Sequence, residues 1–525
     1  MQSQQTTPNH GKKHAIVRVG QALISFFAQF FRDLRDGDLW VRLSLVVFGA
    51  GYFRRGQIVK GILVTALQAF VFIFYPIALW PYVSKFGTLG TVKRAAVFNP
   101  VTLKNEVNDF DHSFMILLFG LVGILVIAAV VLFWIKNIHA VRGLQITDEN
   151  NRKILQEMEK LEQLARQNGA DAQELHRKMQ VLKANTKRIN RFSDDICNLF
   201  NRKFHITLLT LPSLGVMLFT ILPLLVMICV AFTNYDQTHM VPTNLFTWVG
   251  LNNFKTLFTQ SQTITFGYSF GRVLSWTLIW AFFATFTNFI FGILLAMFIN
   301  NRKTHWKRMW RTLFIITIAV PQFVSLLLVR NFFANTGIVN TIFASVGITD
   351  FLKQIGLLSQ SYAYIPFLTD PVWAKVMIIL INMWIGIPYM MLIATGILMN
   401  IPSDILESAR IDGANAFQSF RKITMPYILF VTAPYLVTSI TANINNFNVI
   451  YLLTNDVFVT KDQLLANSNA QEVDLLVTWL YRLTQNYYNY KMASVIGIVI
   501  FIISAVFTVL AFRILIRGDR EERFQ

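Results

Sequence analysis

The chain has 525 residues, of which 54% are hydrophobic and only 14% are charged. This composition excludes an intrinsically disordered chain, a collagen-like fibre and an ordinary soluble enzyme, and it indicates a membrane protein with several spans. Basic residues outnumber acidic ones by 19, so their placement decides whether the charge reflects nucleic-acid binding or membrane orientation.

Residues 1–60 form the first expected region, an amphipathic and interfacial segment on the cytoplasmic side. Apolar side chains recur at helical spacing from Ile16 to Leu34, which is typical of a helix lying on a membrane and equally of a soluble helix. Leu43–Phe53 is too short to span a bilayer, so we expect a re-entrant or interfacial piece. The opening residues lack the apolar stretch of a secretory signal, and no cleaved signal is expected.

Eight longer runs are each apolar enough to cross a bilayer, which predicts an all-α polytopic membrane protein with eight transmembrane helices. Residues 61–135 hold the first two of these helices, and residues 206–525 hold the other six as a core domain. The expected spans are about 61–81, 114–135, 206–232, 273–299, 312–329, 376–399, 427–453 and 492–512.

Basic residues concentrate in alternate connecting segments. Of the 47 Lys and Arg, 35 lie in residues 1–60, 136–205, 300–311, 400–426 and 513–525. Basic loops stay in the cytoplasm, so we expect both termini to be cytoplasmic and no role in nucleic-acid binding. All 28 acidic residues lie outside the eight runs, which argues against proton coupling but leaves sodium coupling through backbone carbonyls open.

Residues 136–205 are a charged cytoplasmic insertion between the second and third spans. Within it, residues 148–192 carry two leucine-rich stripes separated by Asn168-Gly169, a pattern that predicts an antiparallel helical hairpin. The hairpin could be a solvated spacer that packs only on itself or a docking site for a cytosolic partner.

The loop 401–426 between the sixth and seventh spans predicts a helix, a turn and a second helix. Pro402 and Ser403 suit a helix start, and Gly413 suits a left-handed C-terminal cap. A short apolar face follows, and Pro426 is expected to end the element just before the seventh span. Such a compact double helix, tied to two spans, can transmit a push into the membrane.

This loop resembles the EAA loop of binding-protein-dependent ABC importers, through Glu407-Ser408-Ala409, Gly413 and the later Ile423 and Pro426. Ser408 replaces the usual second Ala and Met425 the usual Leu, both small departures. The resemblance implies a coupling helix seated in a cleft of the ATPase subunit, with coupling assigned to Glu407, Ser408, Ala409, Asp412 and Gly413.

Residues 384–391, 443–447 and 452–455 narrow the resemblance to the larger membrane subunit of maltose and maltodextrin importers. The similarity covers about 200–525 and implies the ABC type I importer permease fold. Well-known members carry a large outer domain where residues 233–271 are short here. A short outer loop suits a bacterial cell with one membrane and a lipid-anchored binding protein.

The resemblance also implies the partners. The chain has no phosphate-binding loop, so we expect a non-enzymatic subunit in the plasma membrane, with no catalytic residues and no cofactor, served by separate ATPases. The chain has one coupling loop, so it forms half of a translocation pathway and a second permease subunit is implied. The resemblance further implies two ATPase subunits, an extracellular sugar-binding protein and an oligosaccharide substrate. His112, His139 and His205 lack ligand spacing, so no metal site is expected.

The seventh span is unusually polar between residues 438 and 446. Buried amides in hydrocarbon either hold helices together or line a wet cavity, where they can donate to and accept from sugar hydroxyls. Interhelical contact and sugar contact both remain open. The resemblance places sugar contacts at Ile385, Gly386, Tyr389, Ser439, Asn443 and Asn446.

Two other functions remain possible from the residues alone. A self-sufficient ion-coupled sugar carrier would work without any ATPase. A membrane-embedded lipid-linked sugar transferase would need acidic residues at the membrane face, where Asp404 and Asp412 are available, although no further catalytic constellation accompanies them.

Overall fold

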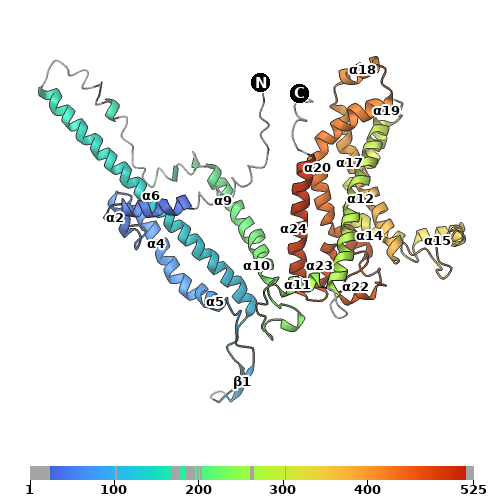
Figure 1. Cartoon of the computed structure of the whole chain (residues 1–525), viewed down its shortest axis with the longest axis horizontal. Coiled ribbons are helices and arrows are strands. Elements are labelled where there is room, and N and C mark those ends of the chain that lie inside the picture. Colours follow the sequence, from blue (N-terminus) through green and yellow to red (C-terminus); the bar gives the residue numbers. More distant parts are fainter. Residues whose placement is uncertain are drawn as a thin grey trace, which may run out of the picture. The chain divides into compact units, whose positions relative to one another are not determined.

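The computed structural model describes residues 24–100, 103–167, 177–178, 180–183, 196–197, 200–201, 204–259, 265–301 and 303–515. The chain divides into two compact units, residues 1–226 with 241–245 and residues 227–240 with 246–525. Each unit is mostly helical and is described by itself (Figure 1).

The predicted all-α membrane fold is confirmed. Within the described residues, seven helices are long and apolar enough to cross a bilayer, and a bent pair makes an eighth. The run 312–329, expected as one transmembrane helix, is broken into α13 (Lys307–Ala319) and α14 (Gln322–Phe332), which meet at 93°. Pro321 disfavours helical backbone at Val320, which is extended at ψ 128°.

The first unit has two helical spans joined by a small hairpin of strands, followed by a third span that runs into the second unit. The strands β1 and β2 pair antiparallel, with Val97 opposite Glu106. The described elements are residues 24–35, α2 (Leu39–Leu43), α3 (Ala50–Arg54), α4 (Ile58–Phe74), η2 (Tyr75–Leu79), α5 (Trp80–Lys85), β1 (Ala96–Asn99), β2 (Lys104–Val107), α6 (Ser113–Gln167), α9 (Phe204–Val216), η3 (Met217–Ile221) and α10 (Leu222–Val230).

The N-terminal helix 24–35 packs on the protein itself along one side. Phe30 and Leu34 lie against a small core that includes Tyr52 and Ile138, whereas Phe31 on the opposite side is exposed. This helix is therefore amphipathic, and residues 16–23 of the predicted one lie outside the described part of the chain.

Helix α6 runs unbroken for 55 residues, from Ser113 to Gln167. It joins the second predicted span to the first arm of the predicted hairpin, so these two segments are one element. At 1.5 Å per residue the helix is about 80 Å long, far more than a bilayer needs. The turn at Asn168-Gly169 and most of the second arm lie outside the described residues.

The second unit is a bundle with short helices at both ends (Figure 1). One end carries α18, and the opposite end carries α22; we call these the α18 end and the α22 end. The elements are η4 (Gln237–His239), α11 (Asn252–Phe258), α12 (Phe266–Asn300), α13 and α14, α15 (Ile338–Ser345), α16 (Ile348–Gln354), α17 (Pro371–Met399), α18 (Ser403–Ile411), α19 (Ala416–Ser419), η5 (Phe420–Thr424), α20 (Met425–Ile444), α21 (Phe447–Thr454), α22 (Gln463–Asn467), α23 (Leu476–Gln485) and α24 (Tyr490–Leu515).

Helices α12 and α17 run parallel and form the centre of this bundle. Near the α18 end, Asn300 Nδ2 donates to Thr395 Oγ1 over 3.1 Å. In the middle, a Cβ added to Gly292 would lie 2.6 Å from Met390 Cγ. The two helices touch closely at Gly292, because glycine has no side chain to hold them apart.

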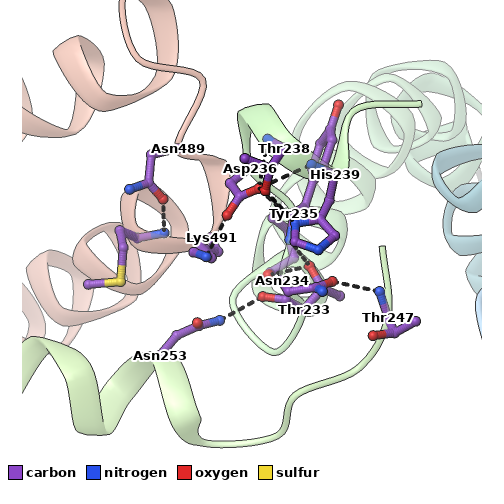
Figure 2. A network of polar contacts seen from close by, with 12 residues as sticks. Thr233, Asn234, Tyr235, Asp236, Thr238, His239, Thr247, Asn253, Asn489 and Lys491 are labelled. Carbon is purple, nitrogen blue, oxygen red and sulfur yellow. Dashed lines mark hydrogen bonds and ion pairs between the residues drawn. The ribbon is translucent and has the colours of Figure 1, made fainter. Parts of the chain in front are cut away.

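At the α22 end, the loop after α10 is fastened to the start of α24 through one carboxylate (Figure 2). Asp236 accepts from Lys491 Nζ at 2.6 Å and also from Thr238 and His239. Burial raises the pKa of Asp236, but the hydrogen bonds from Lys491, Thr238 and His239 outweigh burial and hold that pKa well below its usual value. We call Asp236 and these three partners the clasp; its carboxylate is therefore charged at neutral pH.

Candidate functional site

The predicted coupling loop is a helix closed by a glycine cap at the α18 end. Helix α18 begins at Ser403, directly after Pro402, as predicted. Gly413 has φ +76°, and the amides of Gly413 and Ala414 donate to the carbonyls of Arg410 and Ala409 at 3.0 and 2.9 Å. This pair of bonds is a Schellman motif, so the predicted left-handed cap is confirmed.

The predicted coupling residues lie on the surface of this loop. Glu407, Ser408, Asp412 and Gly413 are exposed, and Ala409 is half-buried. Beside them lie large apolar side chains whose exposure to water is unfavourable. The exposed fraction is 86% for Ile411, 67% for Phe417 and 48% for Ile405. Apolar groups clustered on a protruding loop mark a surface that another protein covers.

The loop continues into α20 without a break, so the prediction that Pro426 ends the element is wrong. Asn415 and Gln418 form a capping box that starts α19. A π-helical turn, η5, then leads directly into α20, and the Met425 amide reaches back to the Phe420 carbonyl. Pro426 falls in the first turn of α20, where a missing N–H is tolerated.

The predicted polar residues of the seventh span face several helices: Asn443 lies where α20 meets α12, Asn446 starts α21, and Thr441 and Asn445 contact α24. Asn443 Nδ2 donates to Thr285 Oγ1 at 2.9 Å, and Trp280 Nε1 donates to the Asn443 carbonyl at 3.1 Å. Asn446 Nδ2 donates to Asn443 Oδ1 at 3.3 Å, while Asn446 Oδ1 accepts from the Val449 amide at the start of α21. Both side chains therefore connect helices, and both retain unused hydrogen-bonding capacity.

Gly386 makes room for an amide of the neighbouring helix. A Cβ placed on Gly386 would lie 2.6 Å from Asn288 Cγ. Asn288 Oδ1 is buried and has no hydrogen-bond partner, and one turn earlier on α17 the Asn382 amide nitrogen is also buried without one. Ile385 is half-buried against the main core.

Tyr389 and Ser439 lie near a third residue, Tyr435. The ring centroids of Tyr389 and Tyr435 lie 6.2 Å apart at 43°, and Ser439 follows Tyr435 by one helical turn on α20. Tyr389 is 49% exposed, so one aromatic face is available. Rings and hydroxyls together suit the apolar faces and hydroxyls of a pyranose.

Sequence reasoning missed the partners of these residues. A polar side chain inside an otherwise apolar span is the signal that could have located these partners. The prediction from sequence used this signal for the seventh span and not for the fourth or the sixth. The predicted sugar-site residues lie on α17 (Ile385, Gly386, Tyr389), on α20 (Ser439, Asn443) and at the start of α21 (Asn446). Their partners are Thr285, Asn288 and Tyr435, and Asn382 lies one turn before Gly386.

Comparison with known proteins decides the family. Residues 288–518 match the family model for the binding-protein-dependent transport system inner membrane component. The maltodextrin transport system permease protein MdxF of Bacillus subtilis (strain 168) is 31% identical over 478 residues, covering 90% of this chain and 94% of the relative. The chain belongs to this permease family.

The permease has a second relative at higher identity. MalC of Streptococcus pneumoniae serotype 4 (strain ATCC BAA-334 / TIGR4), a maltodextrin transport system permease protein, is 38% identical over 318 residues, covering 60% of this chain and 70% of the relative. A bacterial ABC transporter structure involved in import of the polysaccharide alginate matches at TM-score 0.47 and 24% identity, covering 62% of this chain and 100% of that one.

Membership in this family makes the chain a membrane component of an ABC importer with the expected type I permease fold. It disfavours both alternatives, the ion-coupled carrier and the lipid-linked sugar transferase. The coupling loop 401–426 and all six predicted sugar-site residues lie within the matched residues 288–518.

Proposed function

We propose that this permease carries maltose and maltodextrin-type oligosaccharides across the plasma membrane of a bacterium. Two of its relatives are maltodextrin permeases by name. It does no bond chemistry itself; two ATPase subunits supply the energy, a second permease subunit completes the pathway and an extracellular binding protein delivers the sugar.

One observation carries the mechanism. The exposed apolar loop at the α18 end is continuous, through η5, with the helix whose far end holds Asn443. A cleft in the ATPase covers Ile411 and Phe417, with Glu407, Ser408, Ala409, Asp412 and Gly413 around them. Because no flexible linker separates η5 from α20, closure of the ATPases on ATP moves α20 directly.

The sugar passes along the surface shared by α12, α17 and α20. Asn443, Asn446 and Ser439 exchange hydrogen bonds with sugar hydroxyls, and Tyr389 stacks on a ring face. Ile385 and Gly386 border this path. The same amides also join helices, so each has a role in both packing and substrate contact.

The proposed orientation follows from ATP being cytoplasmic. The α18 end and both termini face the cytoplasm, and the α22 end faces outward. Residues 1–60, 61–135 and 136–205 act as the cytoplasmic N-terminal region, the first two spans and the cytoplasmic insertion, while residues 206–525 form the core permease domain.

The test is ATP-driven uptake of labelled maltodextrin by the transporter purified with its co-expressed subunits and reconstituted in liposomes. Glu407→Lys should abolish uptake while ATP hydrolysis by the complex persists, because charge reversal disturbs the ATPase contact. Glu157→Lys, an exposed glutamate on α6, is the matched control and should behave like wild type.

Uptake by Glu407→Lys at the wild-type rate would refute the coupling role. Uptake by liposomes that hold this chain alone would instead favour an ion-coupled carrier. A complex that hydrolyses ATP in response to another sugar class, and not to maltodextrin, would overturn the substrate.

A further inference from the structure

A cavity of about 250 Å³ lies toward the α22 end of the bundle, between residues 272–279 of α12, Lys375 near the start of α17 and the segment that precedes α23. We call it the Glu472 cavity. It is distinct from the polar contacts around Asn443, and its lining is rich in charge. The polar and aromatic lining residues are Arg272, Ser275, Trp276, Lys375, Gln471 and Glu472.

Hydrogen bonds to neighbouring segments hold the cavity wall at Glu472 and Val473 in place. Trp276 Nε1, on α12, donates to the carbonyl of Val473 at 3.1 Å. Glu472 Oε1 accepts from the backbone amides of Lys461 and Asp462, each at 2.8 Å. These bonds fix the position of the carboxylate without using its second oxygen.

Three charged groups line the cavity without forming an ion pair with one another within 4.0 Å. Glu472 Oε2 is buried and has no hydrogen-bond partner. The Lys375 ammonium lies 5.0 Å from the Trp276 ring centroid. Throughout the described part of the chain, no ion pair within 4.0 Å involves Arg272, Lys375 or Glu472.

This set of groups selects a neutral ligand with hydroxyls. An anion would be drawn to Arg272 and Lys375 but repelled by Glu472, and a cation would meet the reverse. A sugar hydroxyl donates and accepts at once, so neighbouring hydroxyls can donate to the free oxygen of Glu472 and accept from the two cations. Bonds to charged groups are also stronger than neutral ones.

The cavity lies a fixed distance from the proposed sugar contacts in the bundle. Eleven residues of α17 separate Lys375 from Gly386, which at 1.5 Å per residue is about 16 Å. Two hexose rings are shorter than this separation, whereas a longer oligosaccharide can span it.

We propose that the Glu472 cavity is an outer subsite that holds the trailing glucose units of long maltodextrins and so sets the permease's preference for chain length. This inference rests on the proposed function. A maltose molecule in contact with Asn443 does not reach the cavity, and its transport is independent of these groups.

The test compares maltose with maltoheptaose in the reconstituted complex, using ATP-driven uptake kinetics. Glu472→Gln keeps an oxygen for the two backbone amides and replaces only the free one. Lys375→Met removes a half-buried cation, which should not destabilise the fold. Lys255→Met, an exposed lysine on α11 outside the cavity, is the matched control, and thermal unfolding of each variant checks folding.

Each cavity variant should raise KM for maltoheptaose about tenfold, the scale of one lost hydrogen bond, and leave KM for maltose within about twofold. The control should match wild type for both sugars. Equal changes for the two sugars, or no change for either, would overturn the subsite. If the wild-type complex transports neither sugar, the proposed function fails and the subsite fails with it.

Discussion

The coupling loop and the bundle interior depart in opposite ways from the arrangement of most proteins, in which apolar side chains are buried and polar ones are exposed. At the α18 end, Ile411 and Phe417 are apolar and exposed. Inside the bundle, Asn382 is buried and Asn288 is half-buried, and each has a buried side-chain atom without a hydrogen-bond partner. Both arrangements cost free energy in an isolated chain. The difference suits the proposed function, in which a protein surface covers the loop and a hydrogen-bonding ligand passes through the interior.

The largest expected effect comes from making the loop polar. Ile411→Glu combined with Phe417→Glu should abolish ATP-driven uptake and prevent co-purification of the ATPase, because two carboxylates would have to enter an apolar contact. The permease itself should stay folded, since both side chains are exposed. Leu155→Glu, which changes an exposed leucine on α6, is the control. Retained ATPase binding in the double variant would contradict a protein surface there.

A smaller effect should follow from filling the glycine position in the bundle. Gly386→Ala should lower the free energy of unfolding by about 1–3 kcal/mol, because the added methyl collides with the Asn288 amide. Thermal unfolding in detergent measures it, and Asn288→Ala should restore part of the loss. Gly396→Ala on the same helix is the control, since a Cβ there meets nothing within 4 Å. Equal destabilisation at both glycines would contradict the close contact.

The pair Asn443 and Thr285 separates packing from sugar contact. Asn443→Leu and Thr285→Val each remove the bond between α20 and α12, and each should lower stability by about 0.6 kcal/mol. Uptake should fall about tenfold further in Asn443→Leu, because that amide also meets the sugar. Equal uptake in the two variants would reduce Asn443 to a packing residue.

The smallest effect concerns the clasp at Asp236. Its folded pKa lies below the unfolded value of about 3.9, so its stabilisation is present above that pH and is lost as pH falls through the folded pKa. Asp236→Asn should lower the unfolding temperature at pH 7, and the difference from wild type should narrow at pH 3. Asp350→Asn, at a carboxylate that is 78% exposed, is the control. A constant difference across this pH range would contradict the charged clasp.

Local chemistry predicted much of the fold. Hydropathy located the spans because a bilayer imposes their length. Gly413 predicted the helix cap because glycine readily adopts the left-handed backbone that this turn needs. Proline was harder to interpret: Pro321 breaks a span that looked straight, whereas Pro426 lies in the first turn of a helix that continues.

The contacts of the candidate site were less predictable, because they join residues far apart in the chain. Asn443 and Thr285 are separated by 158 positions, and nothing in the local pattern of either span pairs them. The six predicted sugar-site residues came from family resemblance, whereas Asn288 and Tyr435 emerged only when α12, α17 and α20 were placed together.

The glycines of α12 and α17 have a mechanical consequence. Met390 occupies the notch at Gly292, and Asn288 occupies the notch at Gly386. Because each of these side chains fits beside a glycine of the other helix, sliding one helix along the other would bring the side chains into steric clash. We therefore expect α12 and α17 to move together as one rigid pair, so that the proposed sugar path opens by rotation of this pair against the neighbouring helices.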